Sequence, residues 1–459
     1  MEAAAEYERK LDAPEGFELP DLGGEPIEPR VFTSVYYDTA DRSLARVGIT
    51  LRRRTERGRS VWQLKLPAGD ARLELEEPGG PAAPPETMAK LLAAHLRNGP
   101  VEPVAELRTR RHGALVARNG TKAEVTIDDV SVMDARRVVE EFVEVEVELK
   151  EGAPKGLDLI AGELADAGAK PSDGTPKVFR VLRLVPEAPA SDTPLDTLQA
   201  RLREQLRALL ANDPGTRLGR DPESLHDMRV AVRRTRALLR TSKPLYTNDI
   251  STFAEELRWL GEKLGAVRDL DVLIDRLGAE ARSFEASDGA DARALLRTLE
   301  RRRTRARTAL LKALSSARYF DLLDRFPLEI GSLAPSGDDA TLTDVARGEL
   351  KKLRTRVRKT ARDAPDTALH SLRKRGKRVR YAYELAGDGS VVKRAKKFQD
   401  VLGEHQDSVV AETTLRELAA ENPERAIVAG RLIEREHGIR AAARKSWRTA
   451  WKRLLRASG

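Results

Sequence analysis

Hydrophobic and polar positions follow two different periods along this chain. Up to about residue 185, short runs alternate between apolar and polar side chains, which is typical of half-buried antiparallel strands. From residue 195 onward, apolar positions recur at the spacing of amphipathic helices. The proline-rich stretch 186–194, PEAPASDTP, separates the two patterns and is the expected linker. We therefore predict an α+β multidomain protein, with an antiparallel β-barrel at 1–185 and an all-α domain at 195–459.

The first pattern also predicts the individual elements of the barrel. Helices are expected at 86–97 and 154–168, and the segment 171–180 (PSDGTPKVFR) is expected to close the unit. Strand-like runs lie at 31–39, 48–54, 60–67, 71–77, 104–111, 114–119, 123–130 and 141–150.

Charged side chains repeat at every second position within these strands. In FVEVEVEL (142–149), the glutamates share one face of the strand and the valines share the other. A polar outer face would explain this in any single antiparallel strand. Because almost every strand carries such a face, with cations and carboxylates both present, the pattern favours a barrel with a polar lumen. The other sets are Arg52 with Arg54, Gln63 with Lys65, Arg72 with Glu74 and Glu76, and Glu106 with Arg108 and Arg110.

A repeated segment organises the helical half. The sequence LHDMRVAVRRTRALLR (225–240) returns as LHSLRKRGKRVRYAYE (369–384), 144 residues later. An LGxxxD segment also recurs further on, with Asp269 in the first copy and Asp407 in the second. Two repeated four-helix bundles, at roughly 195–325 and 340–459, are the simplest explanation. Loops are expected at 212–222, near 285–291, at 333–339 and at 387–390.

Each copy of the repeat carries a stripe of cations headed by a histidine. At about 100° per residue, the stripe of the first copy falls within one sector about 80° wide. A solvated charged face is the ordinary interpretation, but acidic partners at i+3 or i+4 are few, whereas a stabilising surface mixes signs. We therefore expect polyanion contacts from His226, Arg229, Arg233, Arg236 and Arg240, from His370, Arg373, Lys377 and Arg380, and from Arg354, Arg358, Lys393, Lys396 and Lys397 in neighbouring helices.

Composition supports a polyanionic partner. The net charge of +9 divides into −8 for residues 1–195 and +17 for residues 196–459. Aromatic residues make up only 4% of the chain, which argues against base stacking and specific nucleic-acid recognition. Without cysteine, a signal peptide or an apolar run of about 20 residues, the chain is expected to be cytoplasmic, with no disulfides and no membrane partner.

The order of charged residues in the first half resembles the CYTH, or triphosphate tunnel, family over roughly residues 1–185. Its ExExK signature is present as Glu6-Tyr7-Glu8-Arg9-Lys10. The resemblance implies a closed tunnel of antiparallel strands that binds a triphosphate inside. Members hydrolyse tripolyphosphate or thiamine triphosphate, cap RNA or cyclise ATP, with Mg²⁺ or Mn²⁺. The further matches, in family order, are YYDTAD (36–41), the LRRR arginines (51–54), Lys65, Arg72 with Glu74, Arg108 and Arg110, Asp128, Glu144 and Glu146, and Lys177.

The residue types suit that chemistry, because phosphate oxyanions need cations and Mg²⁺ or Mn²⁺ need carboxylate oxygens. Glu8, Glu146 and Lys10 are the expected catalytic residues, and Glu146 is a guess for the base. The expected triphosphate ligands are Arg52, Arg54, Lys65, Arg72, Arg108, Arg110 and Lys177. The expected metal ligands are Glu6, Glu8, Glu144 and Glu146, with Asp128 as a helper.

The second half resembles the CHAD domain over about 195–459, on the paired HxxRxxx[RK]RxR helices and the LGxxxD segments. That resemblance implies binding of inorganic polyphosphate and association with polyphosphate granules. His226 and His370 either contact phosphate or pack between helices, and the role of His405 stays open because Val267 replaces it in the first copy.

These patterns favour a metal-dependent triphosphatase that a basic helical domain holds on polyphosphate. A non-catalytic polyphosphate-binding protein and an adenylate cyclase or nucleotide triphosphatase remain alternatives, and nucleic-acid binding is a weaker one. The sequence fixes neither the length of the substrate chain nor the oligomeric state.

Overall fold

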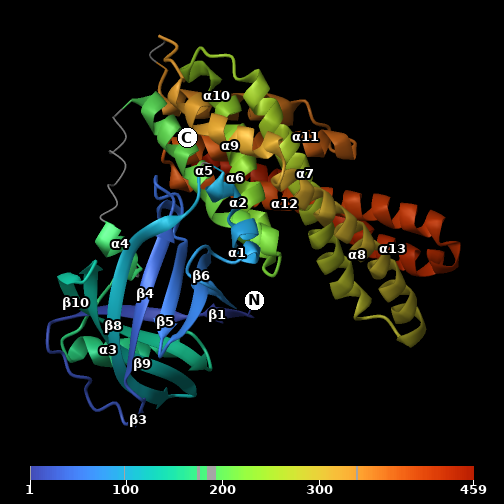
Figure 1. Cartoon of the computed structure of the whole chain (residues 1–459). Helices are drawn as coiled ribbons and strands as arrows, with labels where there is room; N and C mark the ends of the chain where they lie inside the picture. Colours follow the sequence, from blue (N-terminus) through green and yellow to red (C-terminus); the bar gives the residue numbers. More distant parts are fainter. Residues whose placement is uncertain (1, 98, 173–175, 183–192, 338–339, 459) are drawn as a thin grey trace. The chain divides into compact units, whose positions relative to one another are not determined.

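A computed structural model of the chain describes residues 2–97, 99–172, 176–182, 193–337 and 340–458 (Figure 1). The chain divides into two compact units. The first, here called the sheet unit, comprises Met1–Ala188 with Leu210–Ser224. The second, the helical unit, comprises Pro189–Leu209 with Leu225–Gly459. The expected linker at 186–194 lies outside the described residues up to residue 192.

The sheet unit contains an antiparallel sheet of eleven strands, and the predicted α+β class is confirmed. The two expected strands at 104–111 and 114–119 form one continuous strand, because Arg111–Ala114 keep their pairing with the neighbouring strand. The strands are β1 (Glu2–Glu6), β2 (Glu8–Ala13), β3 (Glu25–Pro26), β4 (Arg30–Asp38), β5 (Thr50–Glu56), β6 (Arg59–Ala68), β7 (Ala71–Pro78), β8 (Glu102–Arg118), β9 (Thr121–Asp134), β10 (Arg137–Glu151) and β11 (Lys170–Pro171).

One N-terminal segment supplies the first strand of the hydrogen-bonded ladder and the next-to-last one. The strand order is β1-β7-β6-β5-β4-β8-β9-β10-β2-β11, with β3 paired to β8. Only Tyr7 separates β1, which pairs with β7, from β2, which pairs with β10. The closed tunnel implied by the family resemblance is therefore corrected. The ladder is not closed by hydrogen bonds, but its first strand, β1, is joined through Tyr7 to its next-to-last strand, β2.

Short helices cover the sheet unit and shape the lumen. The expected helix at 86–97 is interrupted at Leu92, which gives α1 (Glu86–Leu91) and α2 (Ala93–Leu96). Helix α3 (Gly156–Asp166) covers β2, β8, β9 and β10 through a buried apolar cluster. Helix α4 (Lys177–Leu182) closes the unit and buries Val178 against Leu107, Val130 and Val132. Because those three side chains belong to the inner face of the sheet, one end of the lumen is apolar.

The described residues from 193 onward are mainly helical, as predicted. Two 3-10 turns, Lys243–Leu245 and Pro423–Arg425, interrupt them, and a third, Ala45–Val47, lies in the sheet unit. The helices are α5 (Pro194–Leu218), α6 (Pro222–Thr241), α7 (Ser251–Ala281), α8 (Ala286–Leu314), α9 (Ala317–Gly331), α10 (Leu342–Arg358), α11 (Asp366–Leu385), α12 (Gly389–Glu421) and α13 (Ala426–Ala457).

The loop expected at 212–222 is wrong, because α5 continues through Pro214 to Leu218. A proline inside a helix leaves the carbonyl four residues earlier without its backbone donor. Here that carbonyl belongs to Leu210, and His95 Nε2 of α2 lies 3.1 Å from its oxygen. A side chain far away in sequence thus supplies the hydrogen bond that the proline cannot make. Within the sheet unit, the nearby Asp213 and Arg217 form a buried ion pair (2.5 Å).

The loop expected near 285–291 is also shorter than predicted. Helix α8 begins at Ala286, and Asp288 lies in its first turn. An acidic side chain at this position is favourable beside the positive end of the helix dipole. The charged, glycine-containing sequence SDGAD therefore begins a helix instead of separating two.

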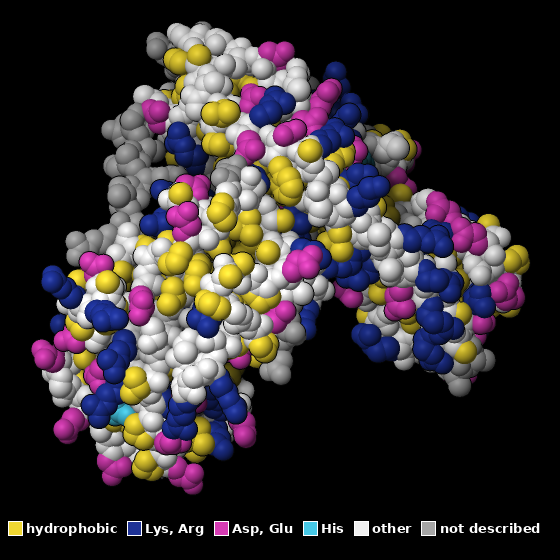
Figure 2. Space-filling model, in the orientation of Figure 1, with side chains coloured by type: hydrophobic (Ala, Val, Ile, Leu, Met, Phe, Trp, Pro, Cys, Tyr) yellow, Lys and Arg dark blue, Asp and Glu magenta, His cyan; other side chains and the backbone are white. Residues whose placement is uncertain are grey.

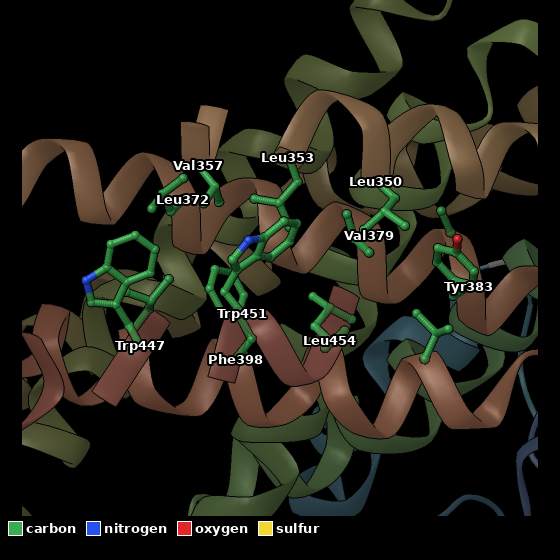
Figure 3. Packing of buried hydrophobic residues seen from close by; sticks show 14 of the residues in the cluster. Leu350, Leu353, Val357, Leu372, Val379, Tyr383, Phe398, Trp447, Trp451 and Leu454 are labelled. Atoms are coloured by element: carbon green, nitrogen blue, oxygen red, sulfur yellow. The ribbon is translucent and has the colours of Figure 1, made fainter. Parts of the chain in front are cut away.

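The repeat relates α5–α8 to α10–α13, and α9 lies between the two sets. In the second set, Trp447 and Trp451 of α13 pack against side chains of α10, α11 and α12, as Figure 3 shows. Phe398 and Trp451 have ring centroids 5.9 Å apart. Burial of such large side chains stabilises this bundle.

Candidate functional site

A polar cavity of about 210 Å³ occupies the lumen of the sheet unit. Side chains opposite one another on paired strands point to the same face, so the register decides which residues meet there. Nine of the residues expected at the site border the cavity: Glu6, Glu8, Lys10, Arg52, Arg54, Lys65, Arg72, Glu146 and Lys177. Asp128 and Glu144 are fully buried and paired with cavity-lining cations.

Arg108 and Arg110 do not reach the lumen, contrary to the prediction. Both are exposed, and their neighbours Thr109 and Arg111 line the cavity instead. Arg111 lies opposite Asp128 in the ladder and donates from Nε to its Oδ1 (2.7 Å) and from Nη2 to its Oδ2 (2.6 Å). The face of β8 that lines the lumen therefore carries the odd-numbered residues.

A signal for Arg111 was present in the sequence. Asn119 and Gly120 have positive φ values of 46° and 78°, as a two-residue hairpin turn requires. Such a turn fixes Arg118 opposite Thr121, and seven further residues along each strand lead to Arg111 opposite Asp128. The other lumen residues outside the predicted set are Arg30, Phe32, Ser34, Tyr36, Thr50, Gln63, Glu74, Glu76, Thr109, Glu124, Glu148, Lys150 and Pro176.

Two lysines, Lys10 and Lys177, neutralise the carboxylates at the centre of the lumen. Lys10 Nζ donates to Glu146 Oε1 (2.8 Å) and to Glu144 Oε2 (3.2 Å). Lys177 Nζ lies 3.2 Å from the same two oxygens and contacts Asp128. Burial opposes the charge on both lysines, but these carboxylates outweigh it and raise each pKa above its usual value. The carboxylates of Glu144 and Glu146 on β10 and of Asp128 on β9 therefore act as counter-ions for two lysines that stay charged.

The two central glutamates have opposite electrostatic settings. Burial alone would raise the pKa of Glu146, but Lys10, Lys177 and Arg111 hold that pKa well below its usual range. Burial dominates at Glu144 and raises its pKa, and its buried Oε1 has no hydrogen-bond partner. Glu146 is therefore ionised and a weak base, which argues against the guess that it accepts the proton.

A second set of contacts lines the wall formed by β1 and β5–β7. Lys65 Nζ donates to both carboxylate oxygens of Glu6 (2.6 Å each). Arg52 donates to Gln63 Oε1 (2.6 Å) and to the hydroxyl of Tyr36 (3.2 Å). These contacts fix the two cations on neighbouring strands, where their charges face the cavity.

The expected metal is chemically compatible with this lumen. Its anionic donors are carboxylates, which Mg²⁺ and Mn²⁺ prefer, and Glu144 Oε1 is a buried acceptor with no hydrogen-bond partner among the described residues. Among the described residues, however, no three acidic or histidine side chains converge as a preformed metal cluster. The carboxylates are instead held by cations, as at Glu6 and Glu146.

In the helical unit, the two predicted cation stripes converge on Lys377 of α11. The charges of Arg373 and Arg380 on its own helix, and of Arg229 and Arg233 on α6, act on its amine together. Each repeat holds its arginine in the same way. Arg229 pairs with Asp269 (2.9 Å) and Arg373 Nη2 lies 3.8 Å from Asp407 Oδ1.

The LGxxxD segments therefore position these arginines. A Cβ added at Gly265 would lie 3.6 Å from the guanidinium of Arg229, and one at Gly403 would lie 3.7 Å from that of Arg373. In each repeat the guanidinium thus lies directly over the glycine, and the aspartate four residues later is its acidic partner.

The remaining predicted cations lie further out. All of them are exposed, and none forms an ion pair with a residue that the structure describes. On the face drawn in Figure 2, dark blue lysine and arginine side chains also gather over the arm that carries α8 and α13. The exposed members of the predicted set are Arg236, Arg240, Arg354, Arg358, Lys393, Lys396 and Lys397.

The histidines differ in their surroundings. His226 and His370 are half-buried at corresponding places on α6 and α11. Burial and the nearby Lys374 lower the pKa of His370. His405 is buried, with Nε2 3.0 Å from Asp366 Oδ1, so it packs α12 against the start of α11.

Comparisons with known proteins match the two halves of the chain to two different domain families. The CYTH domain matches residues 4–169 and the CHAD domain matches residues 200–416. Across 98% of its length the chain is 34% identical to the uncharacterized protein Rv2226 of Mycobacterium tuberculosis, of which it covers 96%. No helix in the described ranges is long and apolar enough to cross a membrane.

Two solved structures are similar to part of the chain. PptA from Streptomyces chartreusis matches 56% of this chain and 99% of its own, with 27% identity and a TM-score of 0.49. The CHAD domain from the plant Ricinus communis matches 58% of this chain and 93% of its own, with 26% identity and a TM-score of 0.49. The match of both domain families, with a relative aligned over nearly the whole length, shows that this chain belongs to the proteins that join a CYTH domain to a CHAD domain.

Proposed function

We propose that the sheet unit is a divalent-metal-dependent triphosphatase for inorganic triphosphate or short polyphosphate, and that the helical unit binds inorganic polyphosphate. The observation that carries the first part is the lumen, where cations and carboxylates from facing strands surround a cavity of about 210 Å³. A tripolyphosphate is a chain of oxyanions that needs such cations. CYTH domains are tunnel enzymes that generally use divalent metals, which supports the same reading.

The lumen suggests that ligand binding exchanges ion pairs. In the structure, Lys65 pairs with Glu6, and Lys10 and Lys177 pair with Glu146. Phosphate oxygens would compete for the same ammonium groups and free the carboxylates. These are then available to Mg²⁺ or Mn²⁺, which would supply charge neutralisation and activate water. The ion-pair network therefore contains both the cations that would bind phosphate and the carboxylates that would bind the metal.

Individual residues have distinct roles in this proposal. Lys10, Lys177 and Arg111 hold the phosphate chain, since carboxylates keep the two lysines charged. Glu6, Glu8 and Glu146 would hold the metal. Glu148 also lines the cavity, and burial raises its pKa, which suits a proton acceptor near neutral pH better than the low pKa of Glu146 does.

The test is phosphate release from tripolyphosphate with Mg²⁺ or Mn²⁺. We expect the wild type to be active and Glu146→Gln to lose at least about 100-fold in kcat/KM. Glu141→Gln is the matched control, because Glu141 is exposed on the same strand. Binding of tripolyphosphate without release by the wild type would favour a non-catalytic lumen. Turnover of ATP alone, with cyclic nucleotide as product, would favour a cyclase.

The second part of the proposal rests on the convergence of α6 and α11 stripes around Lys377. A long flexible polyanion can reach cations that lie half-buried between helices. We expect Arg233→Ala to weaken the binding of long-chain polyphosphate about tenfold, and the control Arg301→Ala, on the exposed face of α8, to change it little. Competition with duplex DNA at fixed salt separates polyphosphate from nucleic acid as the ligand. Association with polyphosphate granules would follow from such binding.

A further inference from the structure

Lys377 lies at the centre of the cluster where the two stripes meet. Arg373 and Arg380 are one turn away on either side of it on α11, and Arg229 and Arg233 face it from α6. Its side chain is half-buried, so little water reaches the amine. Four guanidinium groups therefore surround one ammonium group at a site with poor screening.

Acidic groups compensate this cluster only in part. Arg229 pairs with Asp269 on α7, Arg373 lies 3.8 Å from Asp407 on α12, and Arg380 lies 3.2 Å from Glu384. In the described part of the chain, Lys377 has neither an ion pair nor a hydrogen bond, and Arg233 contacts only the hydroxyl of Tyr381 (3.3 Å). His370 and Lys374, earlier on α11, add further nitrogen groups and no acid.

The protonation of Lys377 follows from this setting. Burial and the charges of Arg373, Arg233, Arg229 and Arg380 lower its pKa from 10.5 to about 7. The lumen lysines show the opposite case, since carboxylates raise the pKa of Lys10 and Lys177. Near neutral pH, the amine of Lys377 is thus only partly protonated in the free protein.

We propose that a phosphate chain binding to this cluster brings a proton with it, which Nζ of Lys377 takes up from solvent, so that binding and protonation are one coupled event. The inference rests on the proposed polyphosphate binding by the helical unit. No covalent bond is made or broken. The lone pair of the amine accepts the proton, and the resulting ammonium adds a charge that the free protein keeps largely unexpressed.

The direction of the pH dependence follows from linkage. A bound polyanion raises the pKa of Lys377, so affinity rises as pH falls from about 9 towards about 7 and levels off below. One coupled proton gives at most about tenfold in affinity per pH unit. His370 does not produce the same signal at pH 8, because burial and nearby cations lower its pKa and it is neutral there. Burial raises the pKa of Asp407, although the charges of Arg373 and Lys377 oppose that rise.

The decisive experiment is calorimetric titration of the full chain with long-chain inorganic polyphosphate at pH 8. Paired runs in Tris and HEPES at equal ionic strength give the number of protons taken up, because the two buffers differ in ionisation enthalpy. We expect close to one proton per binding site for the wild type. Lys377→Arg, which is always charged, should bind polyphosphate with no proton uptake from this position. The matched control Lys374→Arg, one turn earlier and exposed, should behave as the wild type does.

Lys377→Gln provides a second test without added bulk. Its binding should be weaker than that of the wild type at pH 7 and should not change between pH 7 and pH 9. Wild-type binding without proton uptake, or equal uptake in Lys377→Arg, would overturn the coupling while leaving polyphosphate binding intact. Failure of the wild type to bind polyphosphate would instead refute the proposed function of the helical unit.

Discussion

Arg110 and Arg111 are neighbours in sequence whose side chains lie on opposite faces of β8. Arg111 binds the fully buried Asp128 through two hydrogen bonds and also donates to Glu146 (2.5 Å). Arg110 is exposed. The two positions therefore form a natural pair for separating lumen chemistry from surface charge.

We predict that Arg111→Ala abolishes tripolyphosphate hydrolysis and lowers the free energy of unfolding by about 3 kcal/mol, because it removes one partner of a buried ion pair. Arg110→Ala should retain activity and change the free energy of unfolding by less than about 0.5 kcal/mol. Phosphate release and urea denaturation measure the two effects. Equal losses in both variants would contradict the assignment of faces.

Lys377 gives a prediction about stability as a function of pH. Its lowered pKa means that the unfolded chain binds the proton more readily than the folded one, so the lysine destabilises the fold increasingly as the pH falls from about 10.5 to about 7, and by a constant amount below that. We expect Lys377→Met to raise the free energy of unfolding by about 1 kcal/mol at pH 7 after allowance for screening. The gain should shrink towards pH 10.5 and be larger at low salt. Thermal melts at several pH values test this, and a gain that grows with pH would contradict it.

In β8, the alternation of residues does not show which face of the strand lines the lumen. In β6 and in the central parts of β7 and β10, one face is polar or charged and the other apolar, so alternation alone identifies the lumen face. Residues 108–112 of β8 carry charged or ionisable groups on both faces, and alternation cannot choose between them. The hairpin turn at Asn119 and Gly120 decides the register instead. The pairing of carboxylates with lysines, by contrast, requires distances that no sequence pattern contains.

Elements form where local preferences and long-range contacts agree. The strands and most helices could be predicted because their periodicity is strong. The continuation of α5 past Pro214 could not, because it depends on His95, more than a hundred residues earlier, binding the carbonyl of Leu210. Likewise, the split between α1 and α2 has no proline or glycine to mark it.

Substitution of two glycines of the sheet unit by alanine should change the free energy of unfolding in opposite directions. A Cβ at Gly120 or at Gly162 would meet no atom within 4 Å, so only the backbone distinguishes the two positions. Gly120 has φ +78° in the β8–β9 turn, whereas Gly162 lies inside α3. Gly120→Ala should cost about 1 kcal/mol, and Gly162→Ala should stabilise by about 0.5–1 kcal/mol. Urea denaturation of both variants is the measurement, and the same sign for both would contradict this reading.

At the scale of the whole molecule, charge is unevenly divided, with −8 in residues 1–195 and +17 in residues 196–459. Acidic residues at the centre of the first half, such as Glu6 and Glu146, pair with lysines in the lumen, whereas the exposed cations predicted to bind polyphosphate in the second half have no ion-pair partners within the described residues. Domain order and charge asymmetry could therefore be predicted from sequence. The sharing of α5 between the two units could not, because it appears only in three dimensions.

This asymmetry predicts a different salt response for the two proposed activities. Binding of long-chain polyphosphate should weaken by at least about tenfold between 50 and 200 mM salt, since each released counter-ion steepens the dependence. The KM for tripolyphosphate should change less, because lumen charges are shielded from bulk ions. Binding isotherms and initial rates over the same salt series compare them. Parallel slopes would argue that both ligands use one site.

The N-terminal segment β1–β2 pairs with two distant strands, and this has a consequence for synthesis on the ribosome. β1 meets β7 early, but β2 must wait for β10, whose last residue is Glu151. At about 5–20 residues per second, this delay amounts to roughly 4 to 15 seconds. During that interval the nascent chain has the cations of β5 and β6 and the carboxylates of β1 and β7, but it lacks Glu144 and Glu146 of β10. The enclosure that would hold a triphosphate is thus assembled in one late step, when nearly the last strand of the sheet reaches nearly the first.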